Sequence, residues 1–227
     1  MKKVIVITGG SEGLGYEIAK TLSPKNSVII VAHNQEKIEK AAKEIGCDFE
    51  FADVTNLENI KAAVESILKK YGRIDCLINN AGIWIEGELD TNDAERIKET
   101  LDVNVFGVIM FTKEVLPAMK KQKAGRIINI SSDRGLYAKA TRSVYCASKF
   151  AVTGFTHAMA EELAKDGIGV TAIYPSQIQT KLFESAGASR DLTNALEPND
   201  IAKAIEFIVS LNPTAVVTDL AIKSIKQ

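Results

Sequence analysis

Short runs of apolar residues alternate along the chain with longer stretches in which apolar residues recur every three or four positions. A short continuous apolar run, such as residues 4–7, is typical of a strand that is buried on both faces of a sheet. The longer periodic stretches indicate amphipathic helices. Strands are predicted at residues 4–7, 27–32, 47–51, 74–78, 126–130, 169–174 and 215–222.

Helices are predicted between these strands, at residues 14–22, 35–45, 56–71, 93–121, 143–164 and 198–211. Gly46 and Gly72 follow the second and third of them, where a glycine often ends a helix in the left-handed conformation. The stretch 93–121 contains Pro117, which lacks a backbone N–H and is expected to kink the helix or to begin a new turn.

The strict alternation of strands and helices predicts an α/β fold, with a doubly wound, seven-stranded parallel sheet and helices on both faces. The sequence has no linker, low-complexity tract or internal repeat, so residues 1–227 are expected to form a single domain. Residues 181–197 are the longest stretch without clear periodicity. They follow the sixth strand at its carboxyl end, where open α/β sheets bind ligands, and are predicted to be a substrate loop.

The charge balance and the small number of cysteines and histidines argue against several classes of function. Lys plus Arg number 28 and Asp plus Glu number 29, so no basic excess favours a nucleic-acid partner. The N-terminal apolar run is too short for a signal peptide, and no run approaches the roughly 20 residues of a membrane span. Three widely spaced cysteines and two histidines disfavour a disulfide framework or a metal site. We therefore expect a cytoplasmic protein with no metal and no membrane partner.

A glycine-rich turn joins the first predicted strand to the first predicted helix. Residues 8–15 read Thr-Gly-Gly-Ser-Glu-Gly-Leu-Gly. Glycines at such a place permit a tight turn and let a pyrophosphate approach the backbone, while the next helix points its first N–H groups at the anion. No Gly-Lys-Ser/Thr ending follows, which disfavours a nucleoside triphosphatase. The turn therefore predicts a dinucleotide site.

Three further motifs follow this turn. Residues 79–82 read Asn-Asn-Ala-Gly, residues 130–132 read Ile-Ser-Ser, and residues 145–149 read Tyr-Cys-Ala-Ser-Lys. Together with the Gly-x-x-x-Gly-x-Gly turn, they make the chain resemble the short-chain dehydrogenase/reductase family, in its shorter single-domain branch. The resemblance covers nearly the whole chain. It implies a Rossmann-type fold and an NAD(P)(H)-dependent oxidoreductase that interconverts a carbonyl and an alcohol by hydride transfer.

Tyr145 and Lys149 are the candidate catalytic pair. They are four residues apart, so they share one face of the predicted helix. A free phenol has a pKa near 10, and a nearby ammonium favours the phenolate. A shift of about three pKa units requires roughly 4 kcal/mol, which is attainable if the positive charge of a nicotinamide adds to that of the lysine. Such a pair is ordinary in a helix, and the family resemblance is what implies that Tyr145 is the general acid and base.

Two further catalytic residues follow from the resemblance alone. Ser132 lies thirteen residues before Tyr145, which is the family's spacing for a serine that hydrogen-bonds the substrate oxygen. Ser131 is the alternative, but the spacing favours Ser132. Asn104 matches an asparagine on the preceding long helix that, in the family, helps hold a water linking the lysine to solvent.

The residues after the second predicted strand bear on the choice of cofactor. An acidic residue there would bind the adenosine ribose and repel a 2′-phosphate, but the sequence has Ala32 at that position. The missing carboxylate favours NADP(H) over NAD(H), and His33 and Asn34 can donate hydrogen bonds to the phosphate. Glu12 conflicts with this, because NADP-using members often have a basic residue at that place. Its long side chain can turn away, so NADP(H) is favoured.

Further cofactor contacts are implied by the resemblance. Asp53 and Val54 match the pair that frames the adenine, and residues 175–180 match the segment that contacts the nicotinamide amide, although Ser176 stands where the family usually has glycine. The residues predicted to hold the cofactor are Gly9, Ser11, Glu12, Gly13, Leu14, Gly15, His33, Asn34, Asp53, Val54, Asn80, Ala81, Gly82, Tyr145, Lys149, Pro175, Ile178 and Thr180.

Two rival interpretations stay open. A protein of this fold could bind NADP(H) as a redox sensor without turnover, although such proteins tend to lose a catalytic position. A Rossmann-like methyltransferase would need neither Tyr145 nor Lys149.

The substrate does not follow from the sequence beyond a small carbonyl or alcohol. Five residues are candidates for an apolar pocket, although each suits ordinary packing equally well: Trp84, Leu136, Tyr137, Tyr174 and Phe183. The resemblance implies a homodimer or homotetramer that pairs helices around residues 104–121 and 147–165.

Overall fold

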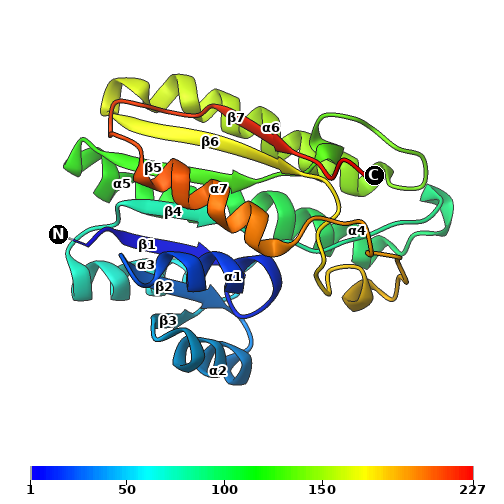
Figure 1. The fold of residues 1–227 in the computed structure, drawn as a ribbon, viewed down its shortest axis with the longest axis horizontal. Coiled ribbons are helices and arrows are strands. Elements are labelled where there is room, and N and C mark those ends of the chain that lie inside the picture. The colour runs from blue at the N-terminus through cyan, green and yellow to red at the C-terminus, as the bar shows by residue number, and fades with distance from the viewer. Residues whose placement is uncertain (1, 227) are drawn as a thin grey trace.

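The architecture was analysed in a computed structural model, in which residues 2–226 are described. Parallel strands form one sheet in the order β3-β2-β1-β4-β5-β6-β7, as Figure 1 shows. Their bounds are β1 Val4–Thr8, β2 Ser27–Ala32, β3 Asp48–Phe51, β4 Cys76–Asn79, β5 Gly125–Ile130, β6 Ile168–Pro175 and β7 Asp219–Ile222. The strand order reverses direction between β1 and β4, which is the doubly wound arrangement that the sequence predicted, and that prediction is confirmed.

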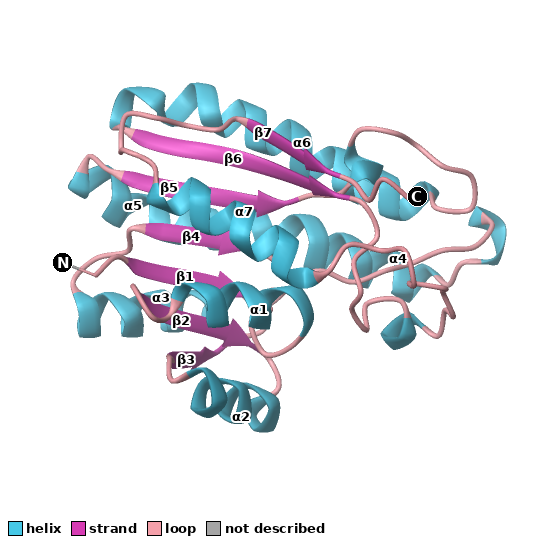
Figure 2. Cartoon of the chain, viewed as in Figure 1, coloured by secondary structure: helices cyan, strands magenta, loops and turns pink. Residues whose placement is uncertain are grey.

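Helices cover both faces of the sheet (Figure 2). The cluster on one face contains residues of α1, α2 and α7, and the cluster on the other contains residues of α3, α5 and α6. The helices are α1 Gly13–Leu22, α2 Gln35–Ile45, α3 Leu57–Tyr71, α4 Ala94–Leu101, α5 Gly107–Gln122, α6 Ser143–Leu163 and α7 Pro198–Ser210.

Strand β1 shows why the apolar runs are continuous. Ile5 and Ile7 pack against the helices of one face, whereas Val4 and Val6 pack against those of the other. Successive side chains of a strand point to opposite faces, so the side chains on both faces of a covered strand are buried and most of them are apolar. Burial of both faces holds the central strands in place and presents their carboxyl ends to one edge of the sheet.

The predicted helix at residues 93–121 divides at a different place than expected. Helix α4 passes through a π-helical turn, Asp102–Phe106, into α5, which runs from Gly107 to Gln122 with Pro117 inside it. Of the two predicted alternatives, that Pro117 begins a new turn is therefore wrong, and that it kinks the helix stays a prediction. Pro117 is exposed, and so is Lys113, whose carbonyl oxygen would otherwise accept from an N–H at position 117.

The C-terminal strand is shorter than predicted. It spans Asp219–Ile222 at the sheet edge, whereas residues 215–222 were expected. The Arg126 guanidinium donates from Nη2 to the Ala215 carbonyl oxygen at 2.9 Å, so that carbonyl is bound by a side chain instead of a neighbouring strand. Among the described residues, no helix has both the length and the apolar character needed to cross a membrane.

Candidate active site

A cleft of about 1400 Å³ runs along the carboxyl ends of the strands, where the arrows of Figure 1 end. Ser132, Tyr145 and Lys149 line it, together with most of the residues predicted to hold a cofactor. Those cofactor residues are Gly9, Ser11, Glu12, Gly13, Leu14, His33, Asp53, Val54, Asn80, Ala81, Gly82, Tyr145, Lys149, Pro175, Ile178 and Thr180. Gly15, Asn34 and Asn104 lie outside this lining.

The glycine-rich turn fits an anion at the start of α1. The helix begins at Gly13 after Glu12, and Glu12 makes no side-chain cap within the described part of the chain. The Glu12 side chain therefore leaves the first N–H groups of α1 uncapped, and Gly13 and Leu14 line the cleft, where phosphate oxygens can accept from such groups. Gly9 and Gly13 have φ of +66° and +58°, a conformation that glycine adopts without strain.

Gly15 serves the packing of the turn. A Cβ at this position would lie 2.5 Å from Asn80 Nδ2 and would overlap the Gly9 carbonyl oxygen. Asn80 in turn donates from Nδ2 to the Thr8 and Gly9 carbonyl oxygens at 3.0 and 3.1 Å. The Thr8 hydroxyl accepts from the backbone N–H groups of Asn80 and Ala81. The two motifs, distant in sequence, therefore form one rigid cradle.

Tyr145 and Lys149 lie in the first turns of α6, which begins at Ser143. Lys149 Nζ is 5.8 Å from the centroid of the Tyr145 ring and donates to the Ile130 carbonyl oxygen at 2.9 Å. Tyr145 is 5% and Lys149 6% exposed. The pair is therefore held in the wall of the cleft, with its polar atoms turned toward the end of β5.

Burial shifts the pKa values of this pair in opposite directions. Burial raises the pKa of Tyr145, and a side-chain hydrogen bond with Ser132 lowers it by less. Burial lowers the pKa of Lys149 to about 8. Without a cofactor the phenol pKa is therefore raised, because desolvation of the phenolate outweighs the hydrogen bond with Ser132. The lowered pKa that the sequence predicts requires the added charge of a nicotinamide and stays a prediction.

Ser132 and Ser131 follow β5 but use their hydroxyls differently. Ser131 Oγ donates to the Lys149 carbonyl oxygen at 3.1 Å, so it fastens β5 to α6. Ser132 Oγ donates to Asp133 Oδ1 and accepts from the Arg134 N–H, each at 3.1 Å. Because Ser132 also hydrogen-bonds the Tyr145 side chain, it is the serine that can meet an atom placed at the phenol.

Asn104 is fully buried inside the π-helical turn. Its Oδ1 accepts from the Ile83 N–H at 2.8 Å, and its Nδ2 donates to the Ile83 carbonyl oxygen at 3.0 Å and to Ser148 Oγ at 3.1 Å. A Cβ on Gly82 would lie 3.3 Å from Asn104 Oδ1 and 3.6 Å from Lys149 Nζ. Asn104 therefore fixes the chain after β4 beside the lysine, and a π-turn at such a place is common near functional sites.

Beside Glu12, which lines the cleft, the structure places a cation that the sequence did not predict. Lys37, in the first turn of α2, forms an ion pair with Glu12 at 3.0 Å between Nζ and Oε2, and both side chains are more than half exposed. Asn34 caps α2 by accepting from the Lys37 N–H at 2.9 Å, which occupies the oxygen of its side chain. No sequence motif marks Lys37. Its place beside Glu12 becomes visible only in the folded chain, where α2 lies next to the glycine-rich turn.

The other end of the cleft is aromatic. The Trp84 ring centroid is 4.3 Å from that of Tyr145 and 4.9 Å from that of Phe183. Leu136 and Tyr137 lie outside the lining of the cleft. Tyr174 also lies elsewhere, and donates to Asp219 Oδ1 at 2.6 Å beside β7.

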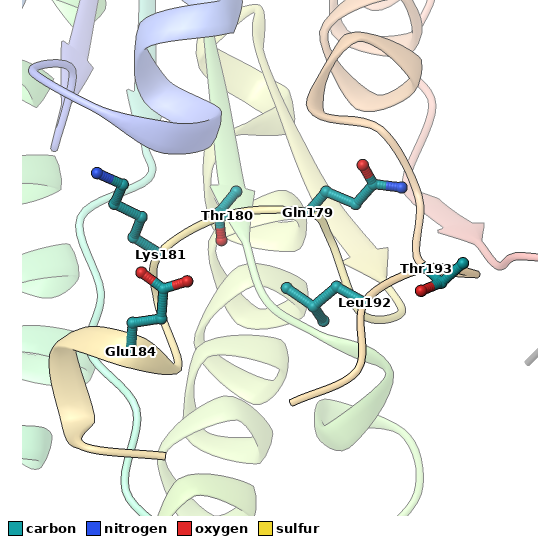
Figure 3. Close-up of a pocket in the computed structure, with 6 residues that line it drawn as sticks. All are labelled: Gln179, Thr180, Lys181, Glu184, Leu192 and Thr193. Atoms are coloured by element: carbon teal, nitrogen blue, oxygen red, sulfur yellow. The ribbon is translucent and has the colours of Figure 1, made fainter. Parts of the chain in front are cut away.

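The predicted substrate loop, residues 181–197, borders the cleft and a second hollow. Within it, residues 184–186 form a short 3-10 turn, and Leu196 pairs with Ile178 in an isolated bridge. The second hollow has a volume of about 370 Å³ and is lined by Gln179, Thr180, Lys181, Glu184, Leu192 and Thr193 (Figure 3). Figure 3 shows that Gln179 to Glu184 line the hollow from one segment, and that Leu192 and Thr193 line it from another.

Comparison with known proteins gives one consistent result. The model of the short chain dehydrogenase family matches residues 3–191. An uncharacterized oxidoreductase of Staphylococcus saprophyticus is 33% identical over an alignment of 239 residues. The alignment covers 99% of this chain and 97% of that protein. The solved 3-ketoacyl-(acyl-carrier-protein) reductase of Brucella melitensis, complexed with NADH, is 29% identical with a TM-score of 0.90, covering 97% of this chain and 96% of the other. ElxO, solved with NADP bound, is 30% identical with a TM-score of 0.87, covering 99% and 98%.

Proposed function

Because the chain belongs to the short-chain dehydrogenase family, as its four motifs predicted, we propose that it interconverts a carbonyl and an alcohol with a pyridine nucleotide. The observation that carries the proposal is the meeting of Ser132, Tyr145 and Lys149 in the cleft that the glycine-rich turn also lines. The reductase of Brucella melitensis, a similar protein, is named for the reduction of a ketoacyl group, which supports the same reaction class.

The residues of the cleft divide the chemistry among them. When bound, the cofactor supplies a hydride to the carbonyl carbon or accepts one from the alcohol carbon. In reduction, the Tyr145 hydroxyl donates its proton to the substrate oxygen. The Ser132 hydroxyl turns from Asp133 to donate to the same oxygen and stabilises the charge that develops there. Lys149 holds the cofactor ribose, and its ammonium favours the phenolate that the proton leaves behind.

The shifted pKa values suit reduction near neutral pH. Burial keeps the phenol of Tyr145 protonated, which is the form that donates to a carbonyl oxygen. Asn104 positions the chain beside Lys149, and in this proposal it helps connect the amine to solvent, so that a proton returns to Tyr145 after each turnover.

We propose NADP(H) as the preferred cofactor. Ala32 leaves no carboxylate at the end of β2 to bind the ribose hydroxyls or repel a 2′-phosphate. Glu12, which argued against NADP(H), is paired with Lys37, so its charge is balanced. The names of the similar structures support both cofactors, since one holds NADH and the other NADP.

The alternative is a non-catalytic NADP(H)-binding redox sensor. A sensor needs the cradle of the glycine-rich turn but places no demand on Ser132 or Tyr145. The presence of the full set Asn104, Ser132, Tyr145 and Lys149 favours the enzyme.

A cofactor-consumption screen tests the proposal. Oxidation of NADPH and NADH is followed by absorbance with a panel of aldehydes and ketones. The reverse reaction, reduction of the oxidised cofactors, is followed with sugar alcohols. The dissociation constants of both cofactors are measured by titration. We expect turnover with at least one carbonyl class and tighter binding of NADPH. Tight binding with no turnover across the panel would favour the sensor, and at least about tenfold tighter NADH binding would overturn the preference for NADP(H).

A further inference from the structure

We propose that the aromatic end of the cleft binds an anionic group, so that the substrate is a carbonyl or hydroxy compound that also carries a carboxylate or a phosphate. The inference rests on the proposed oxidoreductase function and names the substrate class of that same site. It is built on Trp84, Arg142 and Arg190, which line the cleft beside Tyr145.

Trp84 forms a wall between the catalytic phenol and two arginines. Its ring centroid lies 4.3 Å from that of Tyr145, 5.2 Å from Arg142 Cζ and 5.8 Å from Arg190 Cζ. The Trp84 residue is 3% exposed and Arg142 is 7% exposed. The Trp84 ring therefore lies between two guanidinium groups and the predicted position of the reacting oxygen.

Three hydrogen-bond donors of this cluster lack acceptors among the described residues. Among the side-chain atoms of residues 2–226, Trp84 Nε1, Arg142 Nε and Arg190 Nε are all buried without a hydrogen-bond partner. An unsatisfied buried donor costs about 1–3 kcal/mol and is uncommon in folded proteins. Three such donors, gathered at one end of a cleft, point to a ligand that supplies acceptor oxygens.

The charges of the cluster are also unbalanced, with more positive than negative groups. Glu86 forms a close ion pair with Arg190, and the same Glu86 oxygen is 4.0 Å from Arg142 Nε. The neighbouring carboxylate, Asp133, is paired with Arg134 at 2.8 Å. Arg142 is therefore a buried cation that shares one carboxylate with another arginine.

The pKa of Arg142 responds to this crowding. Burial lowers the pKa of its guanidinium, and the charges of Arg190 and Arg134 lower it further. A buried cation among other cations is stabilised when an anion joins it. Guanidinium groups bind carboxylate and phosphate oxygens through paired N–H donors, so both kinds of anion share the required chemistry.

The position of the cluster limits the shape of the substrate. The start of α1, where cofactor phosphates are proposed to bind, is at the glycine-rich turn, whereas Arg142 is next to the first turn of α6 and Arg190 is on the substrate loop. The anion is therefore assigned to the substrate and not to the cofactor. A short chain of carbon atoms separates its anionic group from the carbon that Tyr145 and Ser132 serve.

Matched charged and neutral substrates test the proposal on the wild-type protein. Succinic semialdehyde is compared with its methyl ester, and glyceraldehyde phosphate with glyceraldehyde, by kcat/KM with NADPH. We expect the charged member of at least one pair to be favoured by about tenfold or more, as a charge-assisted hydrogen bond gives. The pair that shows the preference distinguishes a carboxylate from a phosphate.

Substitution of the arginine tests its part in that preference. Arg142→Gln should lower kcat/KM for the charged compound by about tenfold or more and change that of its neutral partner by less than about threefold. Arg142→Lys should restore part of the loss. Arg73→Gln is the matched control, because Arg73 pairs with Asp75 outside the cleft and its loss should leave the preference unchanged.

Trp84 provides a readout that needs no turnover, because it is the only tryptophan of the chain. Butanoate and inorganic phosphate are titrated into the protein while its tryptophan fluorescence is recorded, with butanamide as the neutral probe. We expect a saturable change with at least one anion, present in Arg73→Gln and lost in Arg142→Gln.

The possible results separate the two proposals. Equal turnover of charged and neutral carbonyls, with no effect of anions on Trp84, would overturn the anion site and leave the oxidoreductase proposal intact. A saturable anion effect without turnover of any carbonyl would support the anion site and contradict the proposed reaction. An arginine variant that weakens charged and neutral substrates equally would reduce Arg142 to a residue that merely holds the substrate loop in place.

Discussion

Lys149 is a buried amine in an environment that differs strongly from that of a free side chain. It is 6% exposed, donates to the Ile130 carbonyl oxygen, and has its pKa lowered by burial to about 8. Keeping a charged amine in this position costs stability, and the site retains it because the proposed reaction needs a cation there. Stability given up at a functional residue is a common feature of enzymes.

The cost of this buried amine should appear as a dependence of stability on pH. Between the folded pKa of about 8 and the ordinary value of 10.5, the unfolded chain holds the Lys149 proton more tightly, so stability rises with pH. The free energy of unfolding in urea is compared for wild type and Lys149→Met. From pH 7 to pH 9.5, wild type should gain about 2 kcal/mol relative to the variant.

The comparison stops below pH 10 because ionisation of Tyr145 above that pH would change the free energy of unfolding in the opposite direction. Tyr145 has a raised pKa, so its contribution to stability is present below about pH 10 and is lost only above it. The buried thiols of Cys47 and Cys76 also have raised pKa values, but they are common to both proteins and cancel in the difference. Parallel stability curves for the two proteins would show that Lys149 does not titrate in this range.

At the residue scale, the sequence predicts the spacing of functional side chains along an element. It does not predict how deeply they are buried or which side chains from distant segments surround them. The four-residue separation of Tyr145 and Lys149 places both on one face of α6, because any helix does so. The direction of the phenol pKa shift depends on burial by Trp84 and other side chains that are remote in sequence. Arg142 was missed for the same reason, since its importance comes from the partners that it lacks.

At the scale of elements, the sequence predicts a helix end correctly where residues adjacent to that end determine it. Helix α2 has the predicted bounds, because Asn34 caps its start and Gly46, with φ of +72°, ends it. The π-helical turn Asp102–Phe106 was not predicted. Asn104 there bonds Ile83 on another segment, and a signal of that kind is absent from the local hydrophobic pattern.

The glycine-rich turn gives a prediction at this scale. A methyl group on Gly15 would overlap the Gly9 carbonyl oxygen and crowd Asn80. Gly15→Ala should therefore lower the free energy of unfolding by about 2 kcal/mol and weaken NADPH binding, because the cradle must open to admit the side chain. Thermal unfolding and cofactor titration measure the two effects.

Gly154 is the matched control for this substitution. It lies inside α6, and a Cβ there would meet no heavy atom of the described residues within 4 Å. Gly154→Ala should raise stability by about 0.5–1 kcal/mol and leave cofactor binding unchanged, because alanine costs less conformational entropy in a helix than glycine does. Equal behaviour of the two variants would contradict the packing role assigned to Gly15.

At the scale of the whole molecule, the sheet brings together residues from every part of the chain. The cleft joins the glycine-rich turn, the segment after β4, the start of α6 and the loop after β6, all at the carboxyl ends of parallel strands. The alternating pattern was sufficient to predict this arrangement, because parallel strands place their following loops at one edge. The extent of the domain and the homo-oligomer stay predictions; Phe106 and Phe150 are partly exposed at the start of α5 and on α6, helices expected to pair.

The most direct test of the account is turnover by Tyr145→Phe. The change removes one oxygen atom from the wall of the cleft and keeps the ring that packs on Trp84. NADPH affinity should stay within about threefold of wild type, while turnover of the best carbonyl substrate falls by about a thousandfold, as the loss of a general acid implies. Turnover within about tenfold of wild type, with NADPH binding preserved, would contradict the assignment of the phenol as proton donor.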